Sequence, residues 1–157
     1  MSLSRFVSNT YRRQSQWLGR LACLEPVLQL SARLYVAHVF WVSGLTKVRN
    51  WEGTLFLFQE EYQVPLLPPE VAAWMGTGGE LLLPPLLAVG VLGRFAALGL
   101  SVVNLVAVSS LPEIAPVALM QHVQWAALLV WLAVKGPGPW SVDGWLERRR
   151  INAAARH

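Results

Sequence analysis

One carboxylate stands inside a long apolar stretch of this sequence, and it is the residue best placed to do chemistry. Residues 76–94 are almost wholly apolar or glycine, yet they contain Glu80 and end at Arg94. If the stretch crosses a bilayer, Glu80 lies in the hydrocarbon, where an ionised group is costly unless it is paired or hydrated. A residue of this kind is a functional-site hypothesis, and its partner has to be found elsewhere in the chain.

Arg33 is the first partner that the sequence offers. It begins a stripe in which Ala37, Phe40, Gly44 and Lys47 recur at helical spacing. Glu80 is about 15 Å and Arg33 about 20 Å below the same outer surface, a difference that the long arginine side chain can span if the two stripes face each other. We therefore expect an Arg33–Glu80 pair within the membrane. It would either lock two helices together or form a polar cavity that binds a ligand's head group or passes protons. Lys47 is expected at the mouth of the bundle, where snorkelling alone would explain it.

Further polar candidates lie in the later apolar stretches. Asn104 and His122 are candidates for the same intramembrane site, and Asn104, with Ser101 on its face, is expected to hydrogen-bond across helices. His38 and His122 could ligate a haem, but His38 points about 140° away from the Arg33 stripe. Their alternative role is as hydrogen-bonded packing histidines. No metal-ligand spacing and no nucleophile–base–acid set is found. No autonomous catalytic constellation is therefore seen in the sequence.

Composition places these residues in a membrane protein. Hydrophobic residues make up 54% of the chain and charged residues 14%, against about a quarter charged in soluble domains. Residues 95–112 and 114–134 contain no charged side chain, and a helix needs roughly 20 residues to cross a bilayer core. A soluble helical core would require polar faces that these runs lack.

The periodicity predicts an all-α, polytopic membrane protein with a four-transmembrane-helix bundle. The spans are expected at residues 26–46, 71–92, 95–111 and 117–134. Between the first two, Asn50 and Glu52 predict the start of a short interfacial helix in the first extracytoplasmic loop, stopped by Pro65. We divide the chain into a basic amphipathic segment (1–25), a four-helix transmembrane domain (26–135) and a Gly/Pro break with a basic tail (136–157), in which Ser141 can cap a helix.

Charge sets the expected orientation. The net charge is +4, but the basic residues gather in the two tails and in the turn at Arg94, the pattern of segments at an anionic membrane surface and not of a nucleic-acid groove. By the positive-inside rule, both termini are expected in the cytoplasm, with the protein integral to a bacterial-type cytoplasmic (inner) membrane.

Several residues, taken in order, resemble the DoxX family. They are Arg33 with Gly44-Leu45-Thr46-Lys47, then Val64-Pro65, then Glu80 followed by Gly90-Val91-Leu92-Gly93-Arg94, and last the run from Gly136-Pro137-Gly138-Pro139 through Trp140-Ser141-Val142-Asp143. The resemblance extends from about Arg33 to Asp143, which is most of the chain.

The resemblance implies a four-helix integral membrane protein. The family's name-giving members are subunits of a respiratory thiosulfate:quinone oxidoreductase, and other relatives accompany varied redox or stress-related partners. It therefore favours a membrane subunit of a redox complex with a quinone near Glu80, in contact with the bilayer and with partner subunits or further copies of itself. The alternatives are a non-catalytic scaffold or anchor for a partner protein and, ranked last, a small transporter, because alternating access usually shows internal repeats.

Overall fold

The structure is a computed structural model that describes residues 22–156. Its elements are a 3₁₀ turn, η1 (Ala22–Leu24), followed by the α-helices α2 (Glu25–Arg49), α3 (Trp51–Glu60), α4 (Pro69–Val89), α5 (Gly93–Ser109), α6 (Pro116–Lys135) and α7 (Val142–Ala154). This part of the chain contains no strand, so the all-α prediction is confirmed. Nearly all of the predicted segment 1–25 lies outside the described residues.

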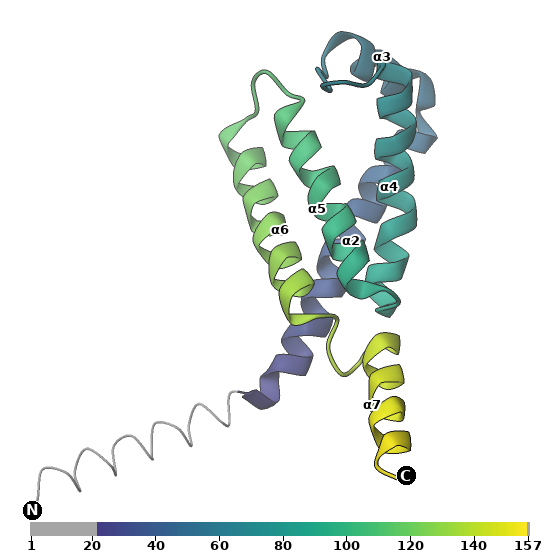
Figure 1. The fold of residues 1–157 in the computed structure, drawn as a ribbon. Coiled ribbons are helices and arrows are strands. Elements are labelled where there is room, and N and C mark those ends of the chain that lie inside the picture. The colour runs from purple at the N-terminus through teal and green to yellow at the C-terminus, as the bar shows by residue number, and fades with distance from the viewer. Residues whose placement is uncertain (1–21, 157) are drawn as a thin grey trace, which may run out of the picture.

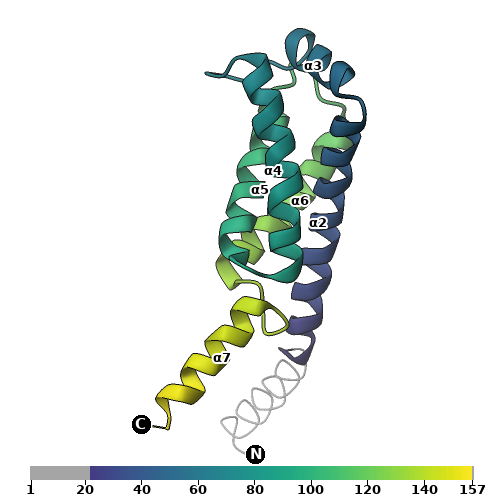
Figure 2. The same ribbon diagram turned by 90° about the vertical axis from the view of Figure 1, so that its right-hand side faces the viewer.

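Four long helices pack side by side (Figure 1). Helix α2 packs on α4, α4 on α5, α5 on α6, and α6 returns to α2. Both views place α3 across one end of this bundle, while α7 leaves the other end, where α2 begins (Figure 2). We refer to these as the α3 end and the α7 end.

The helix boundaries follow from capping and proline chemistry. Asn50 accepts a hydrogen bond from the Gly53 backbone N–H at 3.1 Å, which confirms the predicted start of α3. Ser141 accepts one from Gly144 at 3.0 Å and begins α7 in the same way. Helices α4 and α6 each start at a proline, whose missing N–H has no helical partner in the first turn.

The predicted stripe on α2 is its buried face. Arg33, Ala37, Phe40 and Gly44 are buried, and the central core is formed by apolar side chains from all four long helices: Ala32, Val36, Phe40, Leu87, Ala96, Ala97, Leu100, Leu129 and Leu132. The outer faces keep large apolar groups exposed, among them Leu82, Leu105, Met120 and Val134. A bundle with an apolar exterior is suited to lipid.

The span prediction is supported most directly at α6. Among the described helices, α6 alone is both long and apolar enough to cross a membrane, and α5 is a shorter apolar helix. The structure therefore shows four packed helices, whereas four crossings stay a prediction.

Gly44 brings α2 and α4 into close contact. A Cβ atom at this position would lie 2.9 Å from the Leu81 side chain and 3.0 Å from Glu80 Cβ. Gly78 lies on the facing helix, but a Cβ atom there would meet nothing within 4 Å. Alanine substitution at Gly44 and at Gly78 therefore distinguishes a steric effect on the α2–α4 contact from the general effect of alanine on helix stability.

We expect Gly44→Ala to destabilise the bundle by about 1–3 kcal/mol, because the added methyl group forces α2 away from α4. Gly78→Ala is the matched control and should be neutral or stabilising by up to about 1 kcal/mol, since alanine favours a helix. Thermal unfolding in detergent, followed by helical circular dichroism, measures both variants. Equal midpoints for the two would show that Gly44 is not a close-approach position.

Candidate functional site

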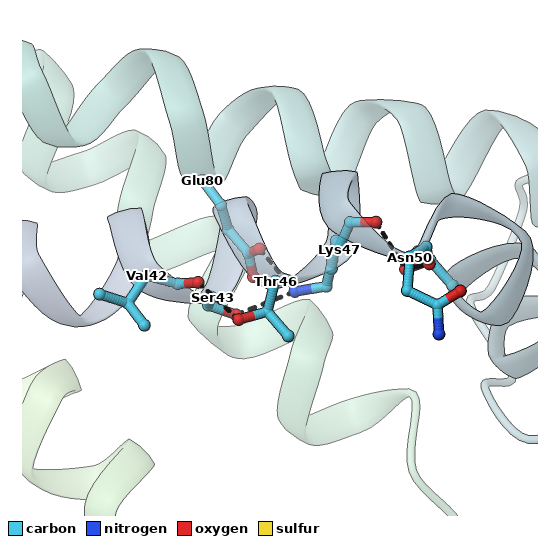
Figure 3. A network of polar contacts seen from close by, with 7 residues as sticks. Val42, Ser43, Thr46, Lys47, Asn50 and Glu80 are labelled. Atoms are coloured by element: carbon cyan, nitrogen blue, oxygen red, sulfur yellow. Dashed lines mark hydrogen bonds and ion pairs between the residues drawn. The ribbon is translucent and has the colours of Figure 1, made fainter.

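Glu80 is paired with Lys47. Lys47 Nζ lies 2.5 Å from Glu80 Oε2 and also donates to Ser43 Oγ at 3.0 Å. Figure 3 shows this ammonium group between the two oxygens, on the side of α2 that faces α4. The Glu80 side chain is 8% exposed and that of Lys47 is 21% exposed. The buried carboxylate of Glu80 therefore has a cation that reaches it from nearer the α3 end.

The structure does not bring Arg33 and Glu80 together, which corrects the predicted pair. Arg33 is 1% exposed and donates from Nη2 to the Trp140 carbonyl oxygen at 2.7 Å. Gly44, not Arg33, faces Glu80. Arg33 is about eleven residues away from Gly44, or about 16 Å along the same helix.

The outer ends of α2 and α4 are not level, and this is the cause of the error. Ala72 and Ala73, near the start of α4, pack against Phe58 of α3. Helix α4 therefore extends past the end of α2, and its Glu80 lies beside the last turns of α2. The available signal was the recurrence of Trp51, Leu55, Phe58 and Tyr62 at helical spacing, because these side chains form an apolar face and the start of α4 packs against it.

A cavity of about 300 Å³ lies beside the ion pair at the α3 end. Its wall is mostly apolar, with side chains from α2, α3, α4, α5 and α6 and from the connection after α3. Its polar members are Ser43, Lys47, Tyr62, Glu80, Ser110 and His122. Burial raises the pKa of the Tyr62 phenol, and the carboxylates of Glu61 and Glu80 raise it further, so this group is a neutral hydroxyl at physiological pH.

Asn104 holds His122 at the cavity wall. Its Nδ2 donates to the His122 carbonyl oxygen at 3.0 Å, and its Oδ1 lies 2.8 Å from His122 Nδ1. The expected cross-helix hydrogen bond of Asn104 is therefore confirmed, whereas Ser101 bonds within its own helix to Ala97. Trp125 contacts the imidazole edge-on, with ring centroids 4.8 Å apart.

The structure gives the two candidate haem ligands different surroundings. His38 is exposed in a groove that it shares with Trp41, Pro84 and Pro85, whereas His122 lines the α3-end cavity. The two histidines therefore line different cavities. Within residues 22–156, no group of three His, Cys, Asp or Glu side chains could hold a metal ion.

Arg33 belongs to a set of contacts at the α7 end that hold the segment 140–143 against the turn at residues 90–93, and we call this set the latch. Asp143 lies in the first turn of α7. Its carboxylate accepts hydrogen bonds from the backbone N–H groups of Leu92 at 3.1 Å and Gly93 at 2.8 Å, and its own N–H donates to the Gly90 carbonyl oxygen at 3.0 Å. The C-terminal segment thus supplies the cap that α5 lacks in its own sequence. Sequence reasoning missed this role, although the chain's only aspartate follows a Gly/Pro break.

Gly90 allows the latch to close tightly. Its φ of 74° is in the left-handed region, which glycine adopts without steric cost. A Cβ atom here would also overlap Arg33 Nη1 and Ser141 Cβ. Arg33 therefore has a structural role at this end, away from the Glu80 cavity.

Breaking the Lys47–Glu80 pair should destabilise the protein asymmetrically. Lys47→Met leaves a buried carboxylate without a partner and should cost about 3 kcal/mol or more. Glu80→Gln should cost less, because Lys47 can extend to the aqueous surface. In unfolding measurements the two changes should be strongly non-additive. For Arg33→Met and Glu80→Gln, the losses in free energy of unfolding should instead add within about 0.5 kcal/mol. A larger coupling energy would mean that Arg33 and Glu80 interact, and would contradict the Lys47–Glu80 assignment.

The latch can be tested at Asp143. Asp143→Ala removes the acceptors for two N–H groups at the start of α5 and should cost about 1–2 kcal/mol. Asp143→Asn keeps one side-chain acceptor and is the matched control, with a smaller loss expected. Limited proteolysis of the segment 136–142 reports the opening of the latch separately from global unfolding. Unchanged cleavage in Asp143→Ala would contradict this role.

Comparison with known proteins agrees with this arrangement. The sequence model of the DoxX family matches residues 28–113. A Haemophilus influenzae relative described as an uncharacterized protein is 37% identical over 82 residues, which cover 50% of this chain and 52% of the relative. The chain thus spans about half the length of the curated relative that it matches. No solved structure gives a significant match. Because the family match covers more than half of the sequence, the chain belongs to the DoxX family of membrane proteins.

Proposed function

We propose that this protein is the membrane subunit of a quinone-linked redox complex and that a quinone head group binds in the α3-end cavity. The observation that carries this proposal is the wall of that cavity, where Lys47, Glu80 and His122 face a mostly apolar space. A volume of about 300 Å³ is at the small end of ligand pockets and suits one substituted ring. Polar groups at fixed points in an apolar wall orient such a ring.

The membrane arrangement that goes with this proposal has α2, α4, α5 and α6 as four crossing helices. The α3 end carries Lys47 and Arg49 against five glutamates: Glu52, Glu60, Glu61, Glu70 and Glu113. The α7 end carries Arg94, Lys135 and the arginines at 148–150. By the positive-inside rule the α7 end lies in the cytoplasm and the cavity opens toward the outer half of a bacterial-type inner membrane.

The side chains of this protein bind and orient, and a partner subunit supplies the electron chemistry. Lys47 uses two of its three N–H hydrogens on Glu80 and Ser43, which leaves one for a carbonyl oxygen of the ring. Glu80 accepts hydrogen bonds from hydroxyl groups. The surrounding apolar residues exclude water and thereby strengthen these contacts.

A second candidate function, a non-catalytic anchor for a partner protein, is favoured by α7. This helix has no buried residue and leaves the bundle (Figure 1). It exposes Trp145, Leu146 and Ile151 beside the arginines at 148–150. Beyond its first turn the apolar side chains of this helix are exposed and available to a cytoplasmic protein.

We expect the full-length protein, purified from native membranes, to retain quinone and to bind added duroquinone in lipid nanodiscs. Ala107→Phe should weaken this binding at least about tenfold, because the ring enters the cavity. Leu105→Phe, on the exposed face of the same helix, is the matched control and should stay near wild type. Quenching of tryptophan fluorescence provides the binding curves, since Trp125 adjoins His122 at the cavity wall.

The same preparation separates the two functions. Quinone that is lost from Ala107→Phe but kept by Leu105→Phe supports the redox subunit. If no quinone is bound and a protein partner is lost when residues 142–157 are deleted, the anchor is correct and the quinone site is rejected.

A further inference from the structure

We propose that the α3-end cavity selects the hydroxyl-bearing, reduced form of its ligand, and that Asn104 sets this preference by fixing the tautomer of His122. The inference rests on the proposed function, because it assumes that the ligand is a quinone–quinol pair. It adds a positioning residue and a redox-form selectivity that the cavity alone does not specify.

The two hydrogen bonds of Asn104 leave one consistent assignment of hydrogens. Its amide nitrogen must be the atom that faces the His122 carbonyl oxygen at 3.0 Å, because an amide oxygen there would place two acceptors together. The amide oxygen then faces His122 Nδ1 at 2.8 Å. An oxygen that only accepts requires a hydrogen on Nδ1. In the neutral imidazole, Nε2 therefore carries the lone pair.

The ring nitrogen that remains for a ligand is thus an acceptor. Nδ1 is used by Asn104, and the ring is held edge-on by Trp125. The residues that line the cavity include one carboxylate, Glu80, and it is already paired with Lys47. No second carboxylate on that wall is present to hold His122 as a cation. The neutral, acceptor-bearing form is the one that the surroundings favour.

The other polar groups on the cavity wall do not share this restriction. Lys47 can donate its third hydrogen, Glu80 can accept, and the hydroxyl groups of Ser43 and Tyr62 can do either. A carbonyl oxygen or a hydroxyl group is satisfied there. His122 Nε2 is satisfied only by a donor, so this residue alone distinguishes the two redox forms.

Quinol and quinone differ in whether their oxygen atoms can donate a hydrogen bond to His122 Nε2. A quinol carries two O–H groups, and one can donate to Nε2 while the other meets Lys47 or Glu80. A quinone presents a carbonyl oxygen, so two lone pairs face each other and both groups lose a partner on desolvation. We expect the wild-type protein to bind duroquinol at least about tenfold more tightly than duroquinone.

The test measures both dissociation constants anaerobically on the full-length protein in nanodiscs, by tryptophan fluorescence. His122→Gln should bring the quinol-to-quinone preference close to one, because a glutamine amide both donates and accepts. His38→Gln is the matched control, since His38 lies in a separate groove, and it should keep the wild-type ratio. Asn104→Leu releases Nδ1, allows either tautomer, and should also lower the ratio.

The possible results bear separately on the selectivity, on the role of His122 and on the quinone site itself. Equal affinity of the wild-type protein for both forms overturns the selectivity but leaves the quinone site intact. A wild-type preference that persists in His122→Gln, with this variant folded as judged by its unfolding midpoint, overturns the role of His122. Binding of neither form overturns both the selectivity and the proposed quinone site.

Discussion

The packing of α2 against α4 depends on the ion pair between Lys47 and Glu80, because the Glu80 carboxylate lies in an apolar interior and needs a partner. Glu80 is nearly covered, and an isolated charge in that position would be far less stable than a paired one. Gly44 removes the side chain that would otherwise separate α2 from α4, and so allows the Lys47 ammonium group to reach the carboxylate from one turn farther along α2. The close helix contact and the ion pair are therefore parts of one arrangement. The cavity lies beside them because Lys47 and Glu80 form part of its wall.

The sequence predicted the helices well, because the signals for them are local. Proline at the start of α4 and α6, Asn50 and Ser141 at the caps, and the apolar periodicity of α2 act within one or two turns. The buried face of α2 also followed from spacing alone. What spacing could not provide was the relative height of α2 and α4, since this depends on how α3 folds over the start of α4. Glu80 lies beside Gly44, which is eleven residues along α2 from Arg33, so Lys47 and not Arg33 is its partner.

The two ends of the bundle place their polar groups for different purposes. At the α7 end, Asp143 caps α5 and Arg33 binds the Trp140 carbonyl oxygen, so charge is used to fasten backbone. At the α3 end, Glu80 and His122 are held by side chains and keep atoms that face open space. Buried polar groups that are fully used indicate structure, whereas groups positioned by others and facing a cavity indicate binding. Arg33 binds backbone through Nη2 while its Nε and Nη1 are buried without a hydrogen-bond partner among residues 22–156, and His122, positioned by Asn104, is the residue that the proposed ligand site uses.

For the proposed quinone site, the positions of Lys47 and His122 give a reason for two polar units in one small cavity. The Lys47–Glu80 pair is close to neutral as a whole, and a neutral pair attracts neither an anion nor a cation strongly. What it offers is a donor and an acceptor close together, which holds a polar ring substituent without distinguishing its hydrogen count. Discrimination requires a second point at which only one kind of group is accepted. An imidazole with one nitrogen already committed provides such a point, because its free nitrogen has a single hydrogen-bonding role as long as Asn104 remains in place.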